Sequence, residues 1–236
     1  MARILELAVR DVRDDSRQVE SGDLFVAMPG QTVDGHAFVG VAKQRGAAAA
    51  VVERIVPDAA GLLQVRVKST LRALAEVAAN RYGHPADALT LVAVTGTNGK
   101  TTTTHLVEAM LEEAGQPTGL LGTIAYRFRD KSWPAPFTTP TALILHQTLA
   151  DLRAQGAAAV ALEASSHALA LDRLHGVHFR VAALTNLTQD HLDFHGDMEQ
   201  YFAAKARLFL DGQYLLPKER GGRAVLPIDD PYGRRL

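Results

Sequence analysis

The sequence contains no cysteine, and it has no long apolar run and no excess of either charge. The missing cysteines exclude disulfide frameworks, thiolate nucleophiles and cysteine-based zinc sites, and they fit a reducing compartment. No run of about 18 apolar residues is present, and residues 1–15 become charged too early for a signal peptide, so a cytoplasmic protein is expected. The chain has 25 lysine and arginine residues and 26 acidic residues. Its net charge therefore does not attract nucleic acid or an anionic membrane, and an anionic ligand must be held by a local group of residues.

The composition is that of an ordinary globular protein. Only 19 glycines and 10 prolines occur among 236 residues, and 47% of the residues are hydrophobic, which excludes fibrous and low-complexity chains. The length fits one large or two small domains. Short apolar runs at 24–27, 47–52 and 63–67 predict strands, with helices over 37–45 and 70–82. The linker-like segment 83–87 then divides a small α/β domain, 1–84, from a second domain, 85–236.

The second domain shows repeated strand-then-helix units. Strands are predicted at 90–94, 158–162 and 179–184. Helices are predicted over 101–114 and 198–210, and a further helix before the second strand is capped by Thr139 and opened by Pro140. The helix over 101–114 places Leu106, Met110 and Leu111 on one face. This alternation predicts a parallel sheet covered by helices, with ligands beyond the carboxyl ends of the strands. Chemistry is therefore expected just after Val94, Leu162 and Leu184.

The first strand end carries the segment T-G-T-N-G-K-T-T, residues 95–102, directly before a helix. Glycines there let several backbone N–H groups point at phosphate oxygens, and the helix N-terminus adds partial positive charge. Lys100 would contact the β- and γ-phosphates and Thr101 would contact Mg²⁺. Val94 replaces the first glycine of the full Walker pattern, so this is the shorter G-x-x-G-K-T form. A glycine turn that only caps a helix is the alternative, but strand, loop, Lys-Thr and helix in register favour nucleotide binding.

The other strand ends carry carboxylates and histidines. Glu163 is either a Mg²⁺ ligand beside the phosphate loop or a surface acid. The third strand end suggests a metal or acid/base site, in which His195 is equally well explained as a loop hydrogen-bonding residue. Zinc hydrolysis is disfavoured because no glutamate follows the first histidine and Gly196 disfavours a helix through both histidines. The crowded residues are Asp190, His191, Asp193 and His195.

Two further sets of polar residues stand out. Thr138 and Thr139 precede Pro140 and form either an anion site or a plain helix start. In the first domain, the segments D-S-R at 15–17, G-D-L-F-V-A at 22–27 and D-G-H at 34–36 are polar and turn-forming. The residue chemistry alone assigns them no ligand.

Taken together, these segments resemble the Mur ligase family from about Asp15 to the last residue. The resemblance implies a small N-terminal α/β domain that binds a nucleotide sugar. It implies next a P-loop NTPase-like, mostly parallel sheet with helices on both faces. The matching segments are D-S-R, G-D-L-F-V-A, D-G-H, Y-G-H-P, T-G-T-N-G-K-T-T-T, G-L-L-G-T-I, T-T-P, E-A-S-S-H-A-L, T-N-L-T-Q-D-H-L-D-F-H-G, Y-F-A-A-K-A-R-L-F and D-D-P-Y-G-R-R-L.

The activity that the resemblance implies is ATP-dependent amide-bond formation in peptidoglycan biosynthesis. The γ-phosphate would pass to the D-glutamyl carboxylate of UDP-N-acetylmuramoyl-L-alanyl-D-glutamate, and the amine of the third amino acid would attack the acyl phosphate. Meso-diaminopimelate is expected as that amino acid rather than lysine. Such chemistry needs positioning and charge neutralisation more than covalent help from the protein.

The resemblance also implies roles for individual residues. Lys100, His191 and Lys205 would be catalytic, and Lys205 matches a lysine carried as a carbamate, which turns a cation into a metal-bridging carboxylate. Sequence alone would make Lys205 a solvated helix lysine. ATP would contact Gly96, Thr97, Asn98, Gly99, Lys100, Thr101 and Thr102, and Mg²⁺ would lie near Thr101, Glu163, His191 and Lys205. Ser16 matches a uridine-nucleotide contact. The positions that hold the muramoyl peptide are matched by Thr138, Thr139, Ser165 and Arg173.

The chain also departs from the family pattern. Leu171 stands where relatives often have a substrate-contacting glutamine, and Pro227-Ile228 where an asparagine is common. The family continues beyond Leu236 through the rest of the central domain and a third domain that selects the amino acid, so a fragment is expected that need not turn over alone. Two alternatives stay open: a non-catalytic module that binds the nucleotide or the UDP-muramoyl peptide, and a regulatory P-loop NTPase. A monomer without nucleic-acid or membrane partners is expected.

Overall fold

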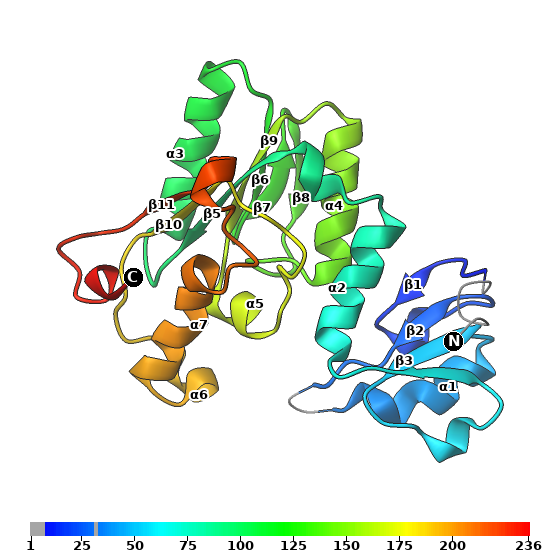
Figure 1. The fold of residues 1–236 in the computed structure, drawn as a ribbon. Helices are drawn as coiled ribbons and strands as arrows, with labels where there is room; N and C mark the ends of the chain where they lie inside the picture. Colours follow the sequence, from blue (N-terminus) through cyan, green and yellow to red (C-terminus); the bar gives the residue numbers. More distant parts are fainter. Residues whose placement is uncertain (1–7, 31–32) are drawn as a thin grey trace. The chain divides into compact units, whose positions relative to one another are not determined.

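The computed structural model describes residues 8–30 and 33–236. Residues 1–7, part of the N-terminal segment that was compared with a signal peptide, lie outside the described residues. The chain divides into two compact units, Met1–Arg81 and Tyr82–Leu236, coloured blue to cyan and cyan to red in Figure 1. The division falls just before the linker-like segment 83–87. In the part of the chain that is described, no helix combines the length and the apolar character needed to cross a bilayer.

The first unit is built on a four-stranded parallel sheet in the order β1-β2-β3-β4. Phe25, Ala50 and Val52 from the central strands pack with Val39 and Ala42 of the first helix to form its core. The helix expected over 37–45 begins as a 3₁₀ turn, Gly35–Phe38, and becomes α-helical only afterwards. The elements are β1 Val12–Arg13, β2 Leu24–Val26, α1 Val39–Gln44, β3 Ala49–Val52, β4 Leu63–Arg66 and α2 Thr70–Arg81.

The D-G-H segment, which sequence reasoning left without a ligand, forms hydrogen bonds inside this unit. His36 is buried and accepts from Glu53 N at Nε2 (2.8 Å), while its Nδ1 lies 2.6 Å from Asp34 Oδ1. Nδ1 therefore carries the proton, because Nε2 is used as an acceptor. A Cβ at Gly35 would lie 2.6 Å from the carbonyl oxygen of Met28, so only glycine fits between these residues. The segment is explained by the fold of the unit.

The second unit contains a seven-stranded sheet in the order β11-β10-β5-β9-β6-β7-β8. Neighbours are parallel except in the β6–β7 and β7–β8 pairs, which are antiparallel. This arrangement confirms the expected mostly parallel α/β fold and adds four strands, β6, β7, β8 and β11, that the sequence analysis did not predict. The strands are β5 Thr90–Thr95, β6 Thr118–Leu121, β7 Ala125–Phe128, β8 Lys131–Pro134, β9 Ala159–Glu163, β10 Val181–Leu184 and β11 Arg223–Val225.

Helices cover both faces of this sheet. The connection from β5 to β6 through α3 runs in one direction along the sheet, and the connection from β6 back to β9 through α4 runs in the other. Since such parallel crossovers are right-handed, α3 and α4 must lie on opposite faces, as Figure 1 shows. The main core lies under α4, where Leu145, Leu149 and Leu152 are buried. The helices are α3 Lys100–Glu113, α4 Ala142–Ala154, α5 Ser166–Ala170, α6 Leu192–His195 and α7 Met198–Leu210.

Two expectations about these helices were wrong. Helix α4 begins at Ala142 with Thr141 as its N-cap, because Thr139 instead donates its hydroxyl to the carbonyl oxygen of Glu163 (2.6 Å). On α3, Leu106 and Met110 are 59% and 62% exposed.

The buried face of α3 is polar. It carries Thr104 and Glu108, and the Glu108 carboxylate accepts from Arg127 Nε of β7 at 2.8 Å. An ion pair has therefore taken the place that the apolar pattern assigned to leucine and methionine.

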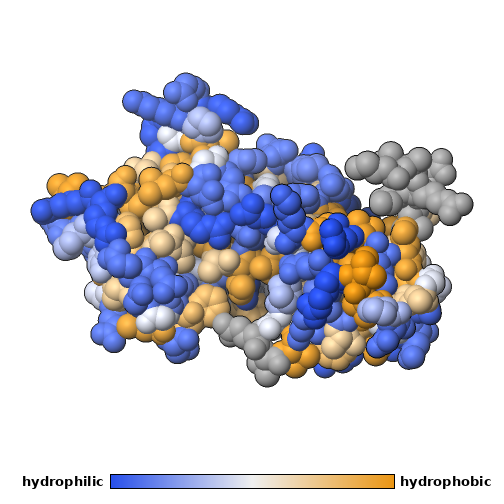
Figure 2. Space-filling model, turned by 60° about the horizontal axis from the view of Figure 1, so that its bottom comes forward, coloured by the Kyte–Doolittle hydropathy of each residue, from blue (hydrophilic) through white to orange (hydrophobic). Residues whose placement is uncertain are grey.

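The surface in Figure 2 shows hydrophilic and hydrophobic residues interspersed over the visible face.

Candidate active site

The strand register brings four strand ends of the second unit to one edge. Val94 of β5 pairs with Glu163 of β9, and Thr95 pairs with Leu184 of β10. Leu121, the last residue of β6, pairs with Leu162. The segments that follow these strands therefore meet at the carboxyl edge, where parallel sheets bind their ligands.

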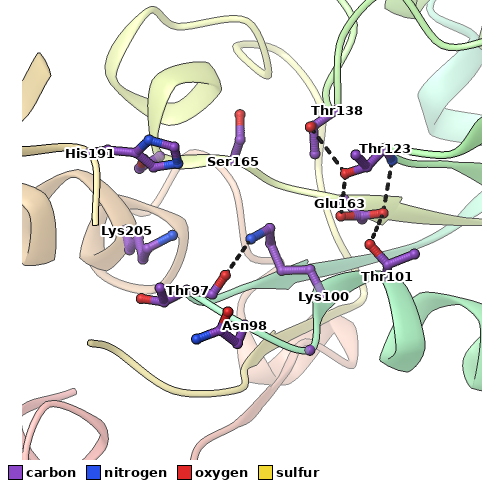
Figure 3. A pocket seen from close by; sticks show the side chains of 12 residues that line it. Thr97, Asn98, Lys100, Thr101, Thr123, Thr138, Glu163, Ser165, His191 and Lys205 are labelled. Atoms are coloured by element: carbon purple, nitrogen blue, oxygen red, sulfur yellow. Dashed lines mark hydrogen bonds between the residues drawn. The ribbon is translucent and has the colours of Figure 1, made fainter. Parts of the chain in front are cut away.

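A cavity of about 250 Å³ opens at this edge. Figure 3 shows its side chains, which come from the loop after β5, the start of α3, the ends of β6 and β9, and helix α7. Ten of the predicted site residues line it, together with Thr123 and Ser166, which were not predicted. The lining residues are Thr97, Asn98, Gly99, Lys100, Thr101, Thr123, Thr138, Glu163, Ser165, Ser166, His191 and Lys205.

The loop after β5 needs its glycines. Gly96 has φ +140°, and a Cβ there would lie 1.9 Å from Thr185 Oγ1. Gly99 has φ +84° and is the N-cap of α3. Thr185, which follows β10, donates its hydroxyl proton to Asn98 O at 2.6 Å and so fixes the position of the loop. The loop is therefore a tightly fixed turn that ends on a helix N-terminus, as a phosphate-binding loop requires.

Two lysine amines converge on this loop. Lys100 Nζ donates to Gly96 O (3.0 Å) and Thr97 O (2.9 Å), and Lys205 Nζ donates to Gly96 O (2.9 Å). Lys205 is only 2% exposed, and burial, assisted by the charge of Lys100, lowers its pKa to about 7. Burial also lowers the pKa of Lys100, against the opposing charges of Glu163 and Asp190. Both shifts reflect a site that disfavours unneutralised cations and would be relieved by a bound anion.

Glu163 is buried at the end of β9, 1% exposed, which excludes the surface-acid alternative. Its Oε1 accepts from Thr101 Oγ1 and from Thr123 N, both at 2.9 Å. Its Oε2 accepts from Thr123 Oγ1 at 3.1 Å. A threonine hydroxyl and a carboxylate beside a phosphate-binding loop are the hard oxygen donors that Mg²⁺ prefers, so these residues fit that ion. A protonated Lys205 amine does not fit as a ligand.

The crowded segment after β10 separates in the structure. His191 adopts φ +52° before α6, lines the cavity, and has its Nε2 3.4 Å from Asp190 Oδ2. His195 is buried and packs on Tyr201, with ring centroids 5.2 Å apart, and Asp193 is exposed. Neither lines the cavity. Over residues 8–30 and 33–236 no group of three histidine or acidic side chains is placed to hold a metal.

The remaining predicted residues lie beside the cavity or elsewhere. Thr139 is buried beneath it and accepts from Ser165 N at 2.9 Å, and Arg173 donates to Thr139 O at 3.1 Å. Thr102 points outward on α3. Ser16 lies in the first unit, buried at the start of a 3₁₀ turn that Asp15 caps.

Sequence reasoning missed three residues that shape the site: Thr123, Ser166 and Tyr201. Tyr201 is fully buried, its hydroxyl lies 3.2 Å from Thr97 Oγ1, and Lys205 Nζ lies 4.7 Å from its ring centroid. Thr123 follows the end of β6, so the strand-end rule that found Glu163 would have found it if β6 had been predicted.

Two family models match this chain. The Mur ligase middle domain matches residues 94–236, and the model described as Mur ligase family, catalytic domain, matches residues 9–82. A ligase of Geobacter metallireducens named UDP-N-acetylmuramoyl-L-alanyl-D-glutamate–2,6-diaminopimelate ligase is 47% identical over 232 residues, 98% of this chain and 45% of the relative. A Clostridium perfringens protein of the same name is 40% identical over 231 residues, 98% of this chain and 46% of the relative.

Solved structures of ligases with related names also match most of this chain. A structure titled as the same 2,6-diaminopimelate ligase has a TM-score of 0.79 at 30% identity, over 96% of this chain and 45% of that one. MurF from Acinetobacter baumannii has a TM-score of 0.61 at 26% identity, over 96% and 45%. MurF from Thermotoga maritima, in complex with ADP, has a TM-score of 0.56 at 26% identity, over 86% and 43%.

The chain thus spans slightly less than half the length of the curated relatives it matches. The middle-domain match covers more than half of the chain and includes the loop, both lysines and Glu163. With the cavity at the carboxyl edge of its sheet, these matches lead to one conclusion: this chain belongs to the Mur ligase family.

Proposed function

We propose that this chain carries the first two structural units of an ATP-dependent ligase that adds meso-diaminopimelate to UDP-N-acetylmuramoyl-L-alanyl-D-glutamate. The observation that carries the proposal is the cavity in which Lys100, Lys205, Glu163 and Thr101 meet. The relatives named for this reaction match 98% of the chain, which supports the choice of diaminopimelate over lysine.

ATP binds with its phosphates on the loop Gly96–Thr102. The backbone N–H groups at the start of α3 and the Lys100 amine face the β- and γ-phosphates. Lys100 gives up its hydrogen bonds to the two backbone carbonyl oxygens and donates to the phosphates instead. The γ-phosphate passes to the D-glutamyl carboxylate, ADP leaves, and the diaminopimelate amine attacks the acyl phosphate to release inorganic phosphate. The chain's part is to orient the two anions and offset their repulsion.

Thr101 and Glu163 would hold Mg²⁺, with His191 lining the same cavity. The ion supplies neutralisation of phosphate charge. Lys205 would join this set as a carbamate, formed when its neutral amine adds to carbon dioxide and releases a proton to water. Its burial and lowered pKa, to about 7, support this, because a neutral amine is the reactive form.

Thr138 and Ser165 face the muramoyl peptide from the cavity wall, and Thr139 and Arg173 support them from beneath. The first unit, with Ser16, takes the uridine end of the same substrate. Since ATP and the nucleotide sugar are cytoplasmic metabolites, the protein acts in the cytoplasm, and we expect a monomer.

Binding and turnover assays test the proposal. The chain should bind a non-hydrolysable ATP analogue with Mg²⁺, and it should bind UDP-N-acetylmuramoyl-L-alanyl-D-glutamate. Phosphate release should require that substrate in the product of the complete reading frame, and diaminopimelate should then be incorporated. ATP hydrolysis that runs equally fast without any muramoyl compound would support a regulatory NTPase and contradict the ligase. Tight binding of both ligands without amide formation by the complete product would support a non-catalytic module.

A further inference from the structure

Thr123 makes more contacts with Glu163 than any phosphate-loop residue among those described. It follows β6, outside the nucleotide loop, and reaches the carboxylate from both its backbone and its side chain. Its N–H donates to Oε1 at 2.9 Å and its hydroxyl lies 3.1 Å from Oε2. Figure 3 shows Thr123 between Glu163 and Thr138.

These contacts fix which carboxylate oxygen faces a ligand. A carboxylate accepts about four hydrogen bonds, two on each oxygen. Oε1 is fully used by Thr101 Oγ1 and Thr123 N, while Oε2 accepts, among the residues the structure describes, only from the Thr123 hydroxyl. One acceptor position therefore stays open on Oε2.

The Thr123 hydroxyl also joins Glu163 to the opposite wall of the cavity. Its oxygen lies 3.1 Å from Thr138 Oγ1 as well as 3.1 Å from Glu163 Oε2. A hydroxyl has a single proton, and the carboxylate oxygen is the stronger acceptor. Thr123 therefore donates its proton to Glu163 Oε2, and Thr138 Oγ1, the other acceptor within reach of the same hydroxyl, lies directly beside this hydrogen bond.

The residue before Thr123 is shaped for the same carboxylate. A Cβ built on Gly122 would lie 2.3 Å from Glu163 Oε1, which is far inside van der Waals contact. Only glycine lets the backbone come close enough for the Thr123 N–H to reach Oε1. The pair Gly122-Thr123 is thus a built cradle for Glu163.

We propose that Thr123 is a positioning residue that orients the Glu163 carboxylate toward the divalent cation and links that orientation to Thr138. The inference rests on the proposed function, since it assumes a Mg²⁺-nucleotide site in this cavity. Thr123 acts through Glu163. The metal-facing oxygen is Oε2, held in place by the Thr123 hydroxyl.

The test compares Thr123→Val with Thr123→Ser in the 236-residue chain. Valine keeps the backbone N–H and nearly the same shape but lacks the hydroxyl, whereas serine keeps it. The readout is Mn²⁺ binding to the ADP complex by electron paramagnetic resonance. Losing a hydrogen bond to a charged group predicts about tenfold weaker Mn²⁺ binding for valine and near wild-type binding for serine. ADP affinity in EDTA should be unchanged in both variants, which shows that the loop is intact.

Gly122→Ala is a second variant that keeps the proposal falsifiable if valine perturbs the fold. It should also weaken Mn²⁺ binding while leaving ADP affinity in EDTA unchanged. Combining Thr123→Val with Thr138→Val should not cost the sum of the single changes, since the two hydroxyl oxygens are in contact, 3.1 Å apart.

Wild-type Mn²⁺ affinity in Thr123→Val, or equal losses in the valine and serine variants, would overturn the positioning role while leaving the ligase proposal intact. A wild-type chain that binds no Mn²⁺ with ADP would overturn both. The two failures are therefore distinguishable.

Discussion

Two lysine amines, of which that of Lys205 is buried, share one backbone carbonyl at the phosphate loop. Lys100 and Lys205 both donate to Gly96 O, although Lys205 lies more than one hundred positions further along the chain. Like charges held this close in a desolvated site oppose each other, and burial already lowers the pKa of both groups. A bound polyphosphate relieves this repulsion, which gives the cavity a preference for anions in a chain of almost no net charge.

Lys100→Ala should weaken ATP binding by about tenfold to a hundredfold, the cost of losing a charge-assisted hydrogen bond to a phosphate. Calorimetric titration with a non-hydrolysable ATP analogue measures the change. Lys131→Ala is the matched control, because that lysine is exposed on β8 and bonds only to Gln155. Unchanged affinity in Lys100→Ala would contradict its assignment to the phosphates.

Lys205→Ala should abolish amide formation by the complete ligase and regain part of it with an added short carboxylic acid. The truncation leaves a buried space lined by Tyr201 and Gly96, in which a small carboxylate can replace the oxygen ligand of the carbamate. Initial rates with and without acetate or propionate provide the measurement. Rescue by a short amine instead of an acid would show that Lys205 acts as a cation.

Burial decides between two interpretations of both Glu163 and Lys205, as a functional residue or as an ordinary surface residue. The strand-end position predicted Glu163 as either a ligand or a surface acid, and its exposure of 1% excludes the second. Lys205 reads as an ordinary helix lysine by spacing, and only its burial marks it as special. Exposure depends on what packs over a residue, which short windows of sequence do not contain.

At the scale of elements, strands and helices with strong local patterns were predicted well. Helix α7 has the bounds expected for it, and β5, β9 and β10 match within a few residues. The expected apolar face of α3 was wrong because its packed side is held by the Glu108–Arg127 ion pair. Strand β8 was missed because it is exposed along its whole length and lacks the alternating pattern that predicts a strand.

Helix α4 carries a buried histidine that should make stability depend on pH. Burial lowers the pKa of His146 to about 4, against 6.5 unfolded; a backbone hydrogen bond at His175 and the charge of Asp87 oppose the shift, and the charges of His84 and His175 add to it. Between pH 6.5 and 4 the unfolded chain therefore binds more protons, so the free energy of unfolding falls as the pH falls. The contribution is of order 3 kcal/mol across this window.

Urea denaturation of wild type and His146→Phe at several pH values between 4.5 and 7.5 checks this. Phenylalanine is apolar and ring-shaped, so it fills the site without titrating. The variant should lose less stability than wild type on acidification. Parallel pH profiles would show that His146 does not titrate in this window.

At the scale of the whole molecule, the chain consists of two units with separate cores. A ligand that binds only the native form of one unit stabilises that unit, by about 2.7 kcal/mol at a hundred times its dissociation constant. We therefore expect two calorimetric unfolding transitions. UDP should raise the midpoint of one, and ADP with Mg²⁺ should raise that of the other.

Two variants assign these transitions. Ser16→Ala should reduce the UDP shift alone, and Lys100→Ala should reduce the ADP shift alone. A single transition that both ligands move together would contradict independent units, and a UDP shift unaffected by Ser16→Ala would contradict the nucleotide-sugar contact.

The sequence by itself determined where strands end and which chemistry follows them, because both depend on short-range patterns: alternation, glycine turns and helix starts. Tertiary structure alone decided which of these segments meet. Thr123 reaches Glu163 across 40 positions and Lys205 reaches Gly96 across 109. Such contacts follow from strand order and register, and these are set by the simultaneous burial of the whole sheet, to which each local segment contributes only a part.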